Sequence, residues 1–193
     1  MHFQFLIPWQ KYAALTVLSL ILTSLSPVVK RSFGADEYQV KVAFLYSFAK
    51  FVQWPSESSP NEDTPFIFSF ISRDSLLSQG AEIENRMIRG RRTVVRYPRT
   101  PEEIDVRSRV LFIHHSMEDE SGTIIQRLKN NPVLIVGDEM DLARRGGTIN
   151  LIKSDNKIRF EVNIDEARRT GLIISSELLQ LARIVTTKDT MSQ

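Results

Sequence analysis

The chain has 193 residues, of which 42% are hydrophobic and 25% charged, and it contains no cysteine. These proportions are typical of one globular domain, so they exclude a disordered chain, a collagen, a polytopic membrane protein and a disulfide-built miniprotein. Without cysteine there is no thiolate nucleophile, redox pair or thiolate zinc site. The formal net charge is +2, but residues 1–35 contain only basic charges, so the remainder is close to neutral. We therefore expect no nucleic-acid partner.

The N-terminal segment has the pattern of a secretory signal. An apolar run over residues 12–25 follows a basic start. The run is shorter than the roughly 20 apolar residues of a membrane span. Small residues up to Ala35 offer a cleavage site, so we expect a signal peptide over the first 35 residues, export to the periplasm and a mature domain over residues 36–193. The basic pair Lys30 and Arg31 favours an uncleaved membrane anchor as the alternative.

Hydrophobic periodicity predicts the elements of the mature chain. Residues 37–54 are expected to form an amphipathic helix whose apolar face is very wide. A helix with such a face is either buried within the domain on both of its sides or covered by a partner, which could be a second copy of the chain in a homodimer. Residues 56–65 are a loop by composition. The elements that follow are a strand over 66–71, a helix over 73–83, a strand over 93–97, a helical turn over 101–106, a strand over 109–113, a helix over 117–129 and a strand over 132–136.

Strand and helix alternate through this central region, and the strands 109–113 and 132–136 are apolar throughout. Both features are typical of a parallel sheet covered on its two faces. Nearer the C-terminus the pattern changes to an antiparallel hairpin with strands 148–152 and 157–163. The second of these strands alternates cleanly, so we expect one apolar face and one solvated face.

Two short helices are expected to close the chain, one over 164–170 and one that begins at Ser175 or Ser176. In the last helix we expect the following residues to pack: Leu178, Leu179, Ala182 and Val185. The fold class predicted from all of these elements is α/β, with three layers, a mostly parallel central sheet flanked by helices, and a C-terminal antiparallel hairpin.

His114 and Asp138 are predicted at the carboxyl ends of two strands, where open α/β sheets bind ligands. A pocket there would make the protein a small-ligand sensor. The chain has neither a Gly-rich dinucleotide motif nor a Walker A loop. His114 and His115 are adjacent, and adjacent strand residues point to opposite faces, so we expect them not to share a metal ion. We predict no metal site and no cofactor.

Three short motifs match those of penicillin-interacting serine acyl enzymes, in the same order. They are the Ser47 and Lys50 pair, the Ser-Asp-Asn of 154–156 and the Arg-Thr-Gly of 169–171. In such enzymes the lysine one turn from the serine activates it. The domain is short for that fold, and the last motif falls at a helix end instead of on an edge strand. A serine acyl enzyme that uses Ser47 and Lys50 is therefore kept only as a remote alternative.

Arginine is dense in one window, which contains Arg86, Arg89, Arg91, Arg92, Arg96 and Arg99. A cluster of this kind could bind phosphate or an acidic partner. Because glutamates flank the window and stacking aromatics are scarce in it, we interpret it as a solvated turn.

Several blocks of the sequence resemble the YfiR-like family of proteins. The resemblance opens with EYQVK at 37–41 and continues through AFLY, FAKF and WP up to residue 55. It continues with VLFI at 110–113, VGD at 136–138, GGTIN at 146–150 and FEVN at 160–163, and it closes with GLIISS at 171–176 and LLQLA at 178–182. The match covers nearly all of the predicted mature chain.

The resemblance implies an exported α/β domain without enzymatic activity. The best-known member of the family is periplasmic and represses a membrane-bound diguanylate cyclase by binding the periplasmic sensory part of that enzyme. An outer-membrane, peptidoglycan-binding lipoprotein sequesters the repressor, and the output is cyclic di-GMP signalling, adhesion and biofilm. We therefore predict a regulatory binding protein. The alternative is a periplasmic ligand-sensing domain that acts on a membrane sensor kinase.

The resemblance also implies disulfides in some relatives, at positions that correspond here to Ser69 with Ser108 and to a pair near Ala143 and Asn150. This chain has no cysteine, so redox control through those bonds cannot operate in it.

For the contact with a partner, we predict a surface on the final hairpin and its neighbours, formed by Ile149, Arg159 and Glu161. An apolar centre with a charged rim is the usual anatomy of an interface.

Overall fold

A computed structural model describes residues 33–55, 64–74, 80–138, 140–155 and 157–187. Residues 1–32, which hold most of the predicted signal peptide, lie outside the described part of the chain. The chain divides into two compact units, Met1–Phe33 and Gly34–Gln193, and the second unit holds all the described strands. Among the described helices, none combines the length and the apolar character needed to cross a membrane.

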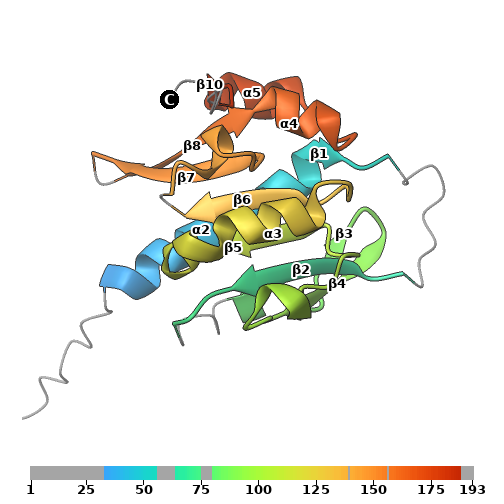
Figure 1. Cartoon of the computed structure of the whole chain (residues 1–193). Coiled ribbons are helices and arrows are strands. Elements are labelled where there is room, and N and C mark those ends of the chain that lie inside the picture. Colours follow the sequence, from blue (N-terminus) through green and yellow to red (C-terminus); the bar gives the residue numbers. More distant parts are fainter. Residues whose placement is uncertain (1–32, 56–63, 75–79, 139, 156, 188–193) are drawn as a thin grey trace, which may run out of the picture. The chain divides into compact units, whose positions relative to one another are not determined.

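Eight strands form the central sheet. Their bounds are Phe66–Ile71 (β2), Met87–Ile88 (β3), Arg91–Arg96 (β4), Val110–Ile113 (β5), Leu134–Asp138 (β6), Ile149–Ser154 (β7), Lys157–Asn163 (β8) and Arg183–Val185 (β10). They lie in the order β10-β8-β7-β6-β5-β2-β4-β3 (Figure 1). The middle strands, from β7 to β4, are parallel to one another. The hairpin β7–β8 is antiparallel, β10 runs parallel to β8, and β3 runs antiparallel to β4.

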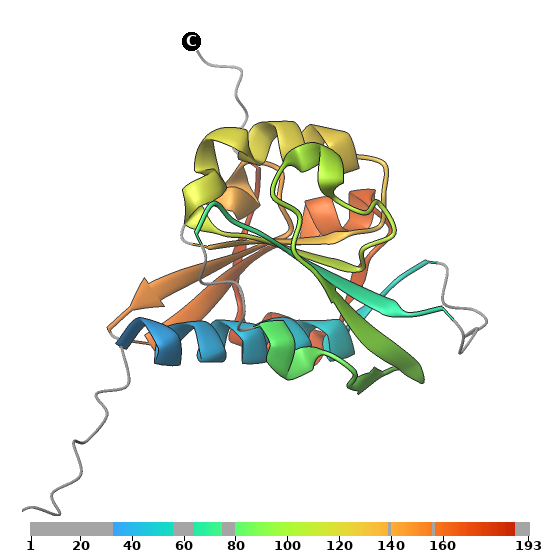
Figure 2. The same ribbon diagram turned by 90° about the horizontal axis from the view of Figure 1, so that it is seen from below.

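Helices lie on both faces of this sheet, as Figure 2 shows. The helices are α2 (Phe33–Phe51), α3 (Ser121–Leu128), α4 (Ile164–Arg169) and α5 (Ser176–Leu181). On the α2 side, Leu45 and Phe48 belong to the same buried cluster as Phe68 of β2. On the other side, Ile124 of α3 shares a second cluster with Leu111 of β5. Because the central strands are covered twice, β2 and β5 are buried at every residue.

The predicted fold class is confirmed: the structure is an α/β domain with a mostly parallel sheet and a C-terminal antiparallel hairpin. The predicted strands all correspond to observed ones. The helix expected over 37–54 begins earlier and ends at Phe51, and the two following residues form β1 (Val52–Gln53), which pairs with β9 (Ile173–Ile174). The helix expected over 117–129 is a 3₁₀ segment, His115–Glu120, followed by α3.

Two predicted helices differ from the structure. Residues 75–79, in the middle of the helix expected over 73–83, lie outside the described part, and residues 80–83 form a 3₁₀ turn. The last helix ends at Leu181 instead of continuing to Val185. Residues 184–187 are all β-branched, which favours a strand, and β10 forms there beside β8.

Candidate functional site

The carboxyl edge of the parallel sheet brings His114 and Asp138 together, as predicted. β5 ends at Ile113 and β6 ends at Asp138, and Ile113 pairs with Gly137 across the two strands. His114 Nε2 lies 3.9 Å from Asp138 Oδ2. Both side chains are buried, His114 with 1% and Asp138 with 0% of its surface exposed.

The helix α2 covers this edge with a chain of alternating charges. Lys41 Nζ lies 2.5 Å from Asp138 Oδ1 and 2.7 Å from Glu37 Oε1. Glu37 Oε2 in turn accepts a hydrogen bond of 2.7 Å from Lys153 Nζ on β7. Burial alone lowers the pKa of Lys41, but its hydrogen bonds with Asp138 and Glu37 outweigh burial and raise that pKa above its usual value. Lys41 is therefore a charged ammonium at neutral pH, next to the buried Asp138 side chain.

Tyr38, one helical turn before Lys41, completes the cluster. Its hydroxyl contacts His114 Nε2 and donates a 3.2 Å hydrogen bond to Asp138 Oδ2. Burial, followed by the charge of Asp138, raises the pKa of Tyr38, so its hydroxyl keeps its proton. Burial, followed by the neighbouring His115, lowers the pKa of His114, so this imidazole is neutral at pH 7.

The expectation that His114 and His115 face opposite sides is wrong. The strand ends at Ile113, and the backbone turns at His114 into the 3₁₀ segment, so strand alternation no longer applies. The two imidazole centroids lie 3.9 Å apart, and His115 Nδ1 is 3.4 Å from Asp138 Oδ2. Asp74, just beyond the end of β2, lies on the same side, with its Oδ2 3.6 Å from His114 Nδ1.

The exposure expected for the hairpin surface is wrong in part. The expected solvated face of β8 is buried in its second half, where Glu161 is 1% and Asn163 0% exposed. The 3₁₀ turn Leu142–Arg144 covers this face: Asn163 Nδ2 donates to the Ala143 carbonyl at 2.7 Å.

Glu161 forms a buried ion-pair group. Arg144 Nη1 lies 3.0 Å from Glu161 Oε2, and the Arg183 guanidinium of β10 pairs with Glu161 Oε1. Ile149, opposite on β7, is also fully buried. Of the three predicted partner residues, only Arg159 is exposed. A charge reversal at Glu161 would place a cation beside two arginines, so it would disturb the fold and would not isolate partner contact.

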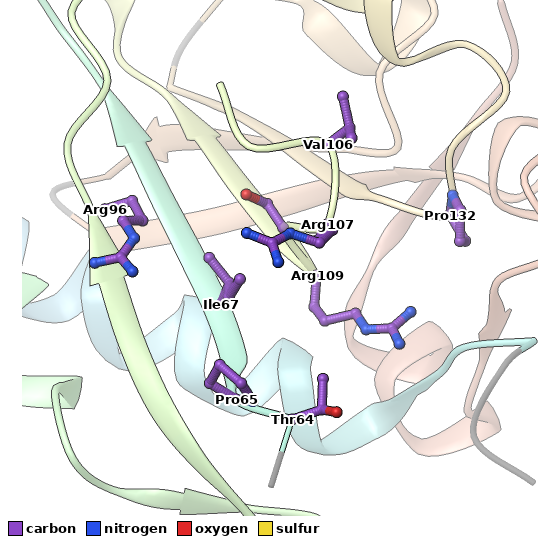
Figure 3. Close-up of a pocket in the computed structure, with 9 residues that line it drawn as sticks. Thr64, Pro65, Ile67, Arg96, Val106, Arg107, Arg109 and Pro132 are labelled. Carbon is purple, nitrogen blue, oxygen red and sulfur yellow. The ribbon is translucent and has the colours of Figure 1, made fainter. Parts of the chain in front are cut away.

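A cavity of about 460 Å³ lies near the opposite, amino-terminal edge of the sheet. In Figure 3, Ile67 lies between Arg96 on one side and Arg107 and Arg109 on the other. Arg107 holds the Asp105 carboxylate, with contacts of 2.9 and 3.0 Å. Three arginines therefore line the cavity, and it is not at the edge that the sequence predicted for a ligand.

Comparison with known families identifies the chain. The family model described as YfiR/HmsC-like matches residues 38–183. The protein belongs to the YfiR/HmsC-like family. No curated protein matches the chain.

In this YfiR/HmsC-like chain, the first implied disulfide position holds a pair of serines in contact. Ser69 Oγ and Ser108 Oγ are hydrogen-bonded at 2.7 Å, and both residues are 1% exposed. At the second position, the Asn150 side-chain oxygen accepts hydrogen bonds from the backbone amides of Met140 and Leu142, each at 3.3 Å. Hydrogen bonds therefore hold both places together without cysteine.

Of the serine acyl motifs, Ser47 and Lys50 have other partners in this structure, and Asn156 of the Ser-Asp-Asn motif lies outside the described residues. Ser47 Oγ donates to the carbonyl of Ala43 in its own helix at 2.9 Å. The ammonium of Lys50 lies 4.4 Å from the Tyr46 ring centroid. The geometry gives no support to Ser47 and Lys50 as a catalytic pair.

Two arginines of the arginine-rich window bind backbone carbonyls. Arg89 donates to the carbonyls of Lys50 and Val52, at 3.3 and 2.7 Å, where α2 ends. Arg86 donates to the carbonyl of Glu82 at 2.6 Å. Cationic groups near a helix C-terminus stabilise the unpaired carbonyls there.

Sequence reasoning missed Tyr38 and Lys41, the two α2 residues that complete the carboxyl-edge cluster. Lys41 is 2% exposed although lysine is rarely buried. A signal was present, because Lys41 follows Glu37 by four residues and interrupts the apolar side of a helix. A lysine in that position indicates a buried carboxylate elsewhere in the fold.

Proposed function

We propose that this protein is a periplasmic, non-enzymatic regulator that represses a membrane-bound diguanylate cyclase by binding its periplasmic part. The observation that carries this proposal is the match to the YfiR/HmsC-like family over residues 38–183. Binding shifts such an enzyme only by the difference in affinity between its active and inactive states. The regulator therefore needs an accessible binding surface and no catalytic group. An outer-membrane, peptidoglycan-binding lipoprotein would compete for the same regulator.

Exposed apolar residues at the C-terminal end of the domain support a contact surface there. Ile173 is 62%, Leu181 76% and Ile184 48% exposed. Ile184 lies on β10, the edge strand of the sheet. Exposed apolar side chains form the usual centre of an interface. We therefore move the proposed surface from Ile149 and Glu161 to Ile173, Leu181 and Ile184. Arg159 is exposed, but it lies on the face of β8 opposite to Val162, the residue that pairs with Ile184.

Leu181→Glu is expected to weaken repression, because it places a charge in the apolar centre of this surface. A central interface residue contributes about 2 kcal/mol, which corresponds to an approximately 30-fold weaker complex. The measurements are the cyclic di-GMP level of cells that carry the cognate membrane cyclase, and binding of that cyclase's purified periplasmic part.

The matched control is Met87→Glu, since Met87 is an apolar residue 57% exposed on β3, at the other edge of the sheet. It should leave both readouts unchanged. Equal effects of the two variants, or no effect of Leu181→Glu, would contradict the surface. A purified chain that fails to bind any cyclase part would contradict the function itself.

A second candidate function, a sensor of a small anionic ligand, is favoured by the cavity in Figure 3. Guanidinium groups bind carboxylates and phosphates in planar, two-pronged contacts. Such a sensor would act on a membrane sensor kinase or on the cyclase itself.

For this second candidate, citrate or pyrophosphate at about 100 times its dissociation constant is expected to raise the melting temperature by about 5–10 °C. Arg96→Glu should abolish the shift, because Arg96 lines the cavity. Arg99→Glu, a change of the same charge outside the lining, should preserve it. Identical shifts in both variants would argue against the cavity as the binding place.

A further inference from the structure

Three possible metal ligands meet at the carboxyl edge of β2 and β5. The two strands are neighbours, and Ile71 pairs with Ile113 at their ends. Asp74 follows β2, and His114 and His115 follow β5. One ligand atom from each of these three residues lies within 4.8 Å of the others.

The hydrogen bonds of His114 fix which of its nitrogens carries the lone pair. The backbone amide of Ser116 donates to His114 Nδ1 at 3.1 Å, so Nδ1 is unprotonated. The Tyr38 hydroxyl donates to Asp138, so it accepts from His114 Nε2, which carries the ring proton. The Ser116 hydroxyl also lies 2.8 Å from this Nδ1, and Asp74 Oδ2 lies 3.6 Å from it.

His115 has a carboxylate behind it as well, because its Nδ1 lies 3.4 Å from Asp138 Oδ2. In the tautomer that donates from Nδ1 to this carboxylate, Nε2 carries the lone pair. Each imidazole thus has one nitrogen held from behind, in His114 by Tyr38 and in His115 by Asp138. The other nitrogen is the one that an ion would bind, and in His114 the ion would displace Ser116 from it. Metal-binding histidines in proteins are held in this way by carboxylates behind them.

The spacing of Asp74 and His114 suits an ion between them. Asp74 Oδ2 and His114 Nδ1 are both acceptors, and they face each other at 3.6 Å. Two ligand atoms bound to tetrahedral zinc at about 2.0–2.1 Å are separated by about 3.3 Å. A divalent ion between these two acceptor atoms would be coordinated by both of them.

We propose that Asp74, His114 and His115 bind one divalent ion of the zinc class, with water in the remaining position. Two imidazole nitrogens and one carboxylate oxygen are a ligand set that Zn²⁺ prefers over Mg²⁺ and Ca²⁺. The side chains of Asp74 and His115 are 49% and 58% exposed, so the ion can enter from solvent. Binding replaces the hydrogen bond between Ser116 and His114 Nδ1, and it joins the segment after β2 to the segment after β5.

Titration of the purified chain, without a histidine tag, with Zn²⁺ and Co²⁺ tests the site. We expect one ion per chain and no competition by Mg²⁺ or Ca²⁺. Bound Co²⁺ should show the visible absorption spectrum of an ion with a low coordination number, and added Zn²⁺ should abolish that spectrum. Loss of a side chain that only supports a metal ligand weakens metal binding by roughly 10- to 100-fold. His115→Gln and Asp74→Asn each remove a proposed ligand, so each should weaken binding by at least that factor. Both residues are half exposed, so these variants keep the fold.

Asp119→Asn is the matched control, because Asp119 is a carboxylate 90% exposed close to the same segment. It should bind the ion as the unchanged chain does. Tyr38→Phe removes the acceptor behind His114 and should weaken binding less than loss of a ligand. The proposal is overturned by the absence of stoichiometric binding, or by His115→Gln and Asp74→Asn variants that bind with unchanged affinity. A loss of equal size in Asp119→Asn would overturn it as well.

Discussion

Replacing Lys41 with methionine is expected to lower the free energy of unfolding by about 3–5 kcal/mol, the cost of breaking a buried ion pair from one side. The Asp138 carboxylate is 0% exposed, and Lys41 Nζ, 2.5 Å away, is its principal counter-charge among the described contacts. Without the ammonium, the carboxylate would have to stay charged in a buried site without its counter-charge or take up a proton, and both cost free energy. Urea denaturation at neutral pH measures the loss.

A double-mutant cycle separates the pair from other effects of the substitution. Asp138→Asn alone should also destabilise, because it removes one of the two carboxylates that pair with the buried Lys41 ammonium. Adding Asp138→Asn to Lys41→Met removes both charges, so the double variant should lose much less than the sum of the single losses. Additive losses would contradict the account. Lys153→Met is the control, since Lys153 pairs with Glu37 at 2.7 Å but its side chain is 42% exposed, and this variant should cost less than about 1 kcal/mol.

The pH dependence of this pair has a definite sign. The folded-state pKa of Lys41 is raised above its usual 10.5. The stability that depends on its protonation is therefore fully present below the unfolded-state pKa and is lost only as the pH rises through the folded-state value. The difference between the unchanged chain and Lys41→Met should accordingly stay constant through neutral pH and shrink only in strongly alkaline solution.

The layered fold could be predicted because its determinants are local in sequence. The apolar runs of β5 and β6 and the alternation with helices indicate a parallel sheet covered twice. β10 was missed because a three-residue edge strand after a helix has no periodicity of its own, and only its pairing with β8 stabilises it. The buried state of Glu161 was missed for a related reason: alternation reports which face a residue is on but not what covers that face.

The candidate site could be predicted only in part. The carboxyl-end rule places His114 beside Asp138. It does not say that a helix far earlier in the chain supplies Lys41 and Tyr38 to the same edge, because that contact spans about 100 residues of sequence. The backbone turn at His114 could not be predicted from the sequence either. A change of backbone dihedral angles at a strand end decides whether two adjacent side chains point to opposite faces or to the same side.

Introducing Ser69→Cys together with Ser108→Cys is expected to form a disulfide and to raise the free energy of unfolding by about 4 kcal/mol. The two hydroxyl oxygens are 2.7 Å apart and fully enclosed, so thiols placed there face each other. The bond would join residues 39 apart, and the gain comes chiefly from the restricted unfolded chain. Denaturation with and without a reductant measures it, because the reduced variant lacks the cross-link but keeps the same substitutions.

The same double variant also reports on the compartment of the protein. Disulfides form in the periplasm and stay reduced in the cytosol. If the chain is exported, the cysteines should be oxidised when the protein is isolated from its own cells without added oxidant, and thiol-specific labels should react only after reduction. Ser69→Cys alone is the control, because a single enclosed thiol cannot be protected by a partner. A stable, folded double variant recovered with both thiols free would contradict export, whereas an oxidised variant no more stable than its reduced form would contradict the geometry of the serine pair.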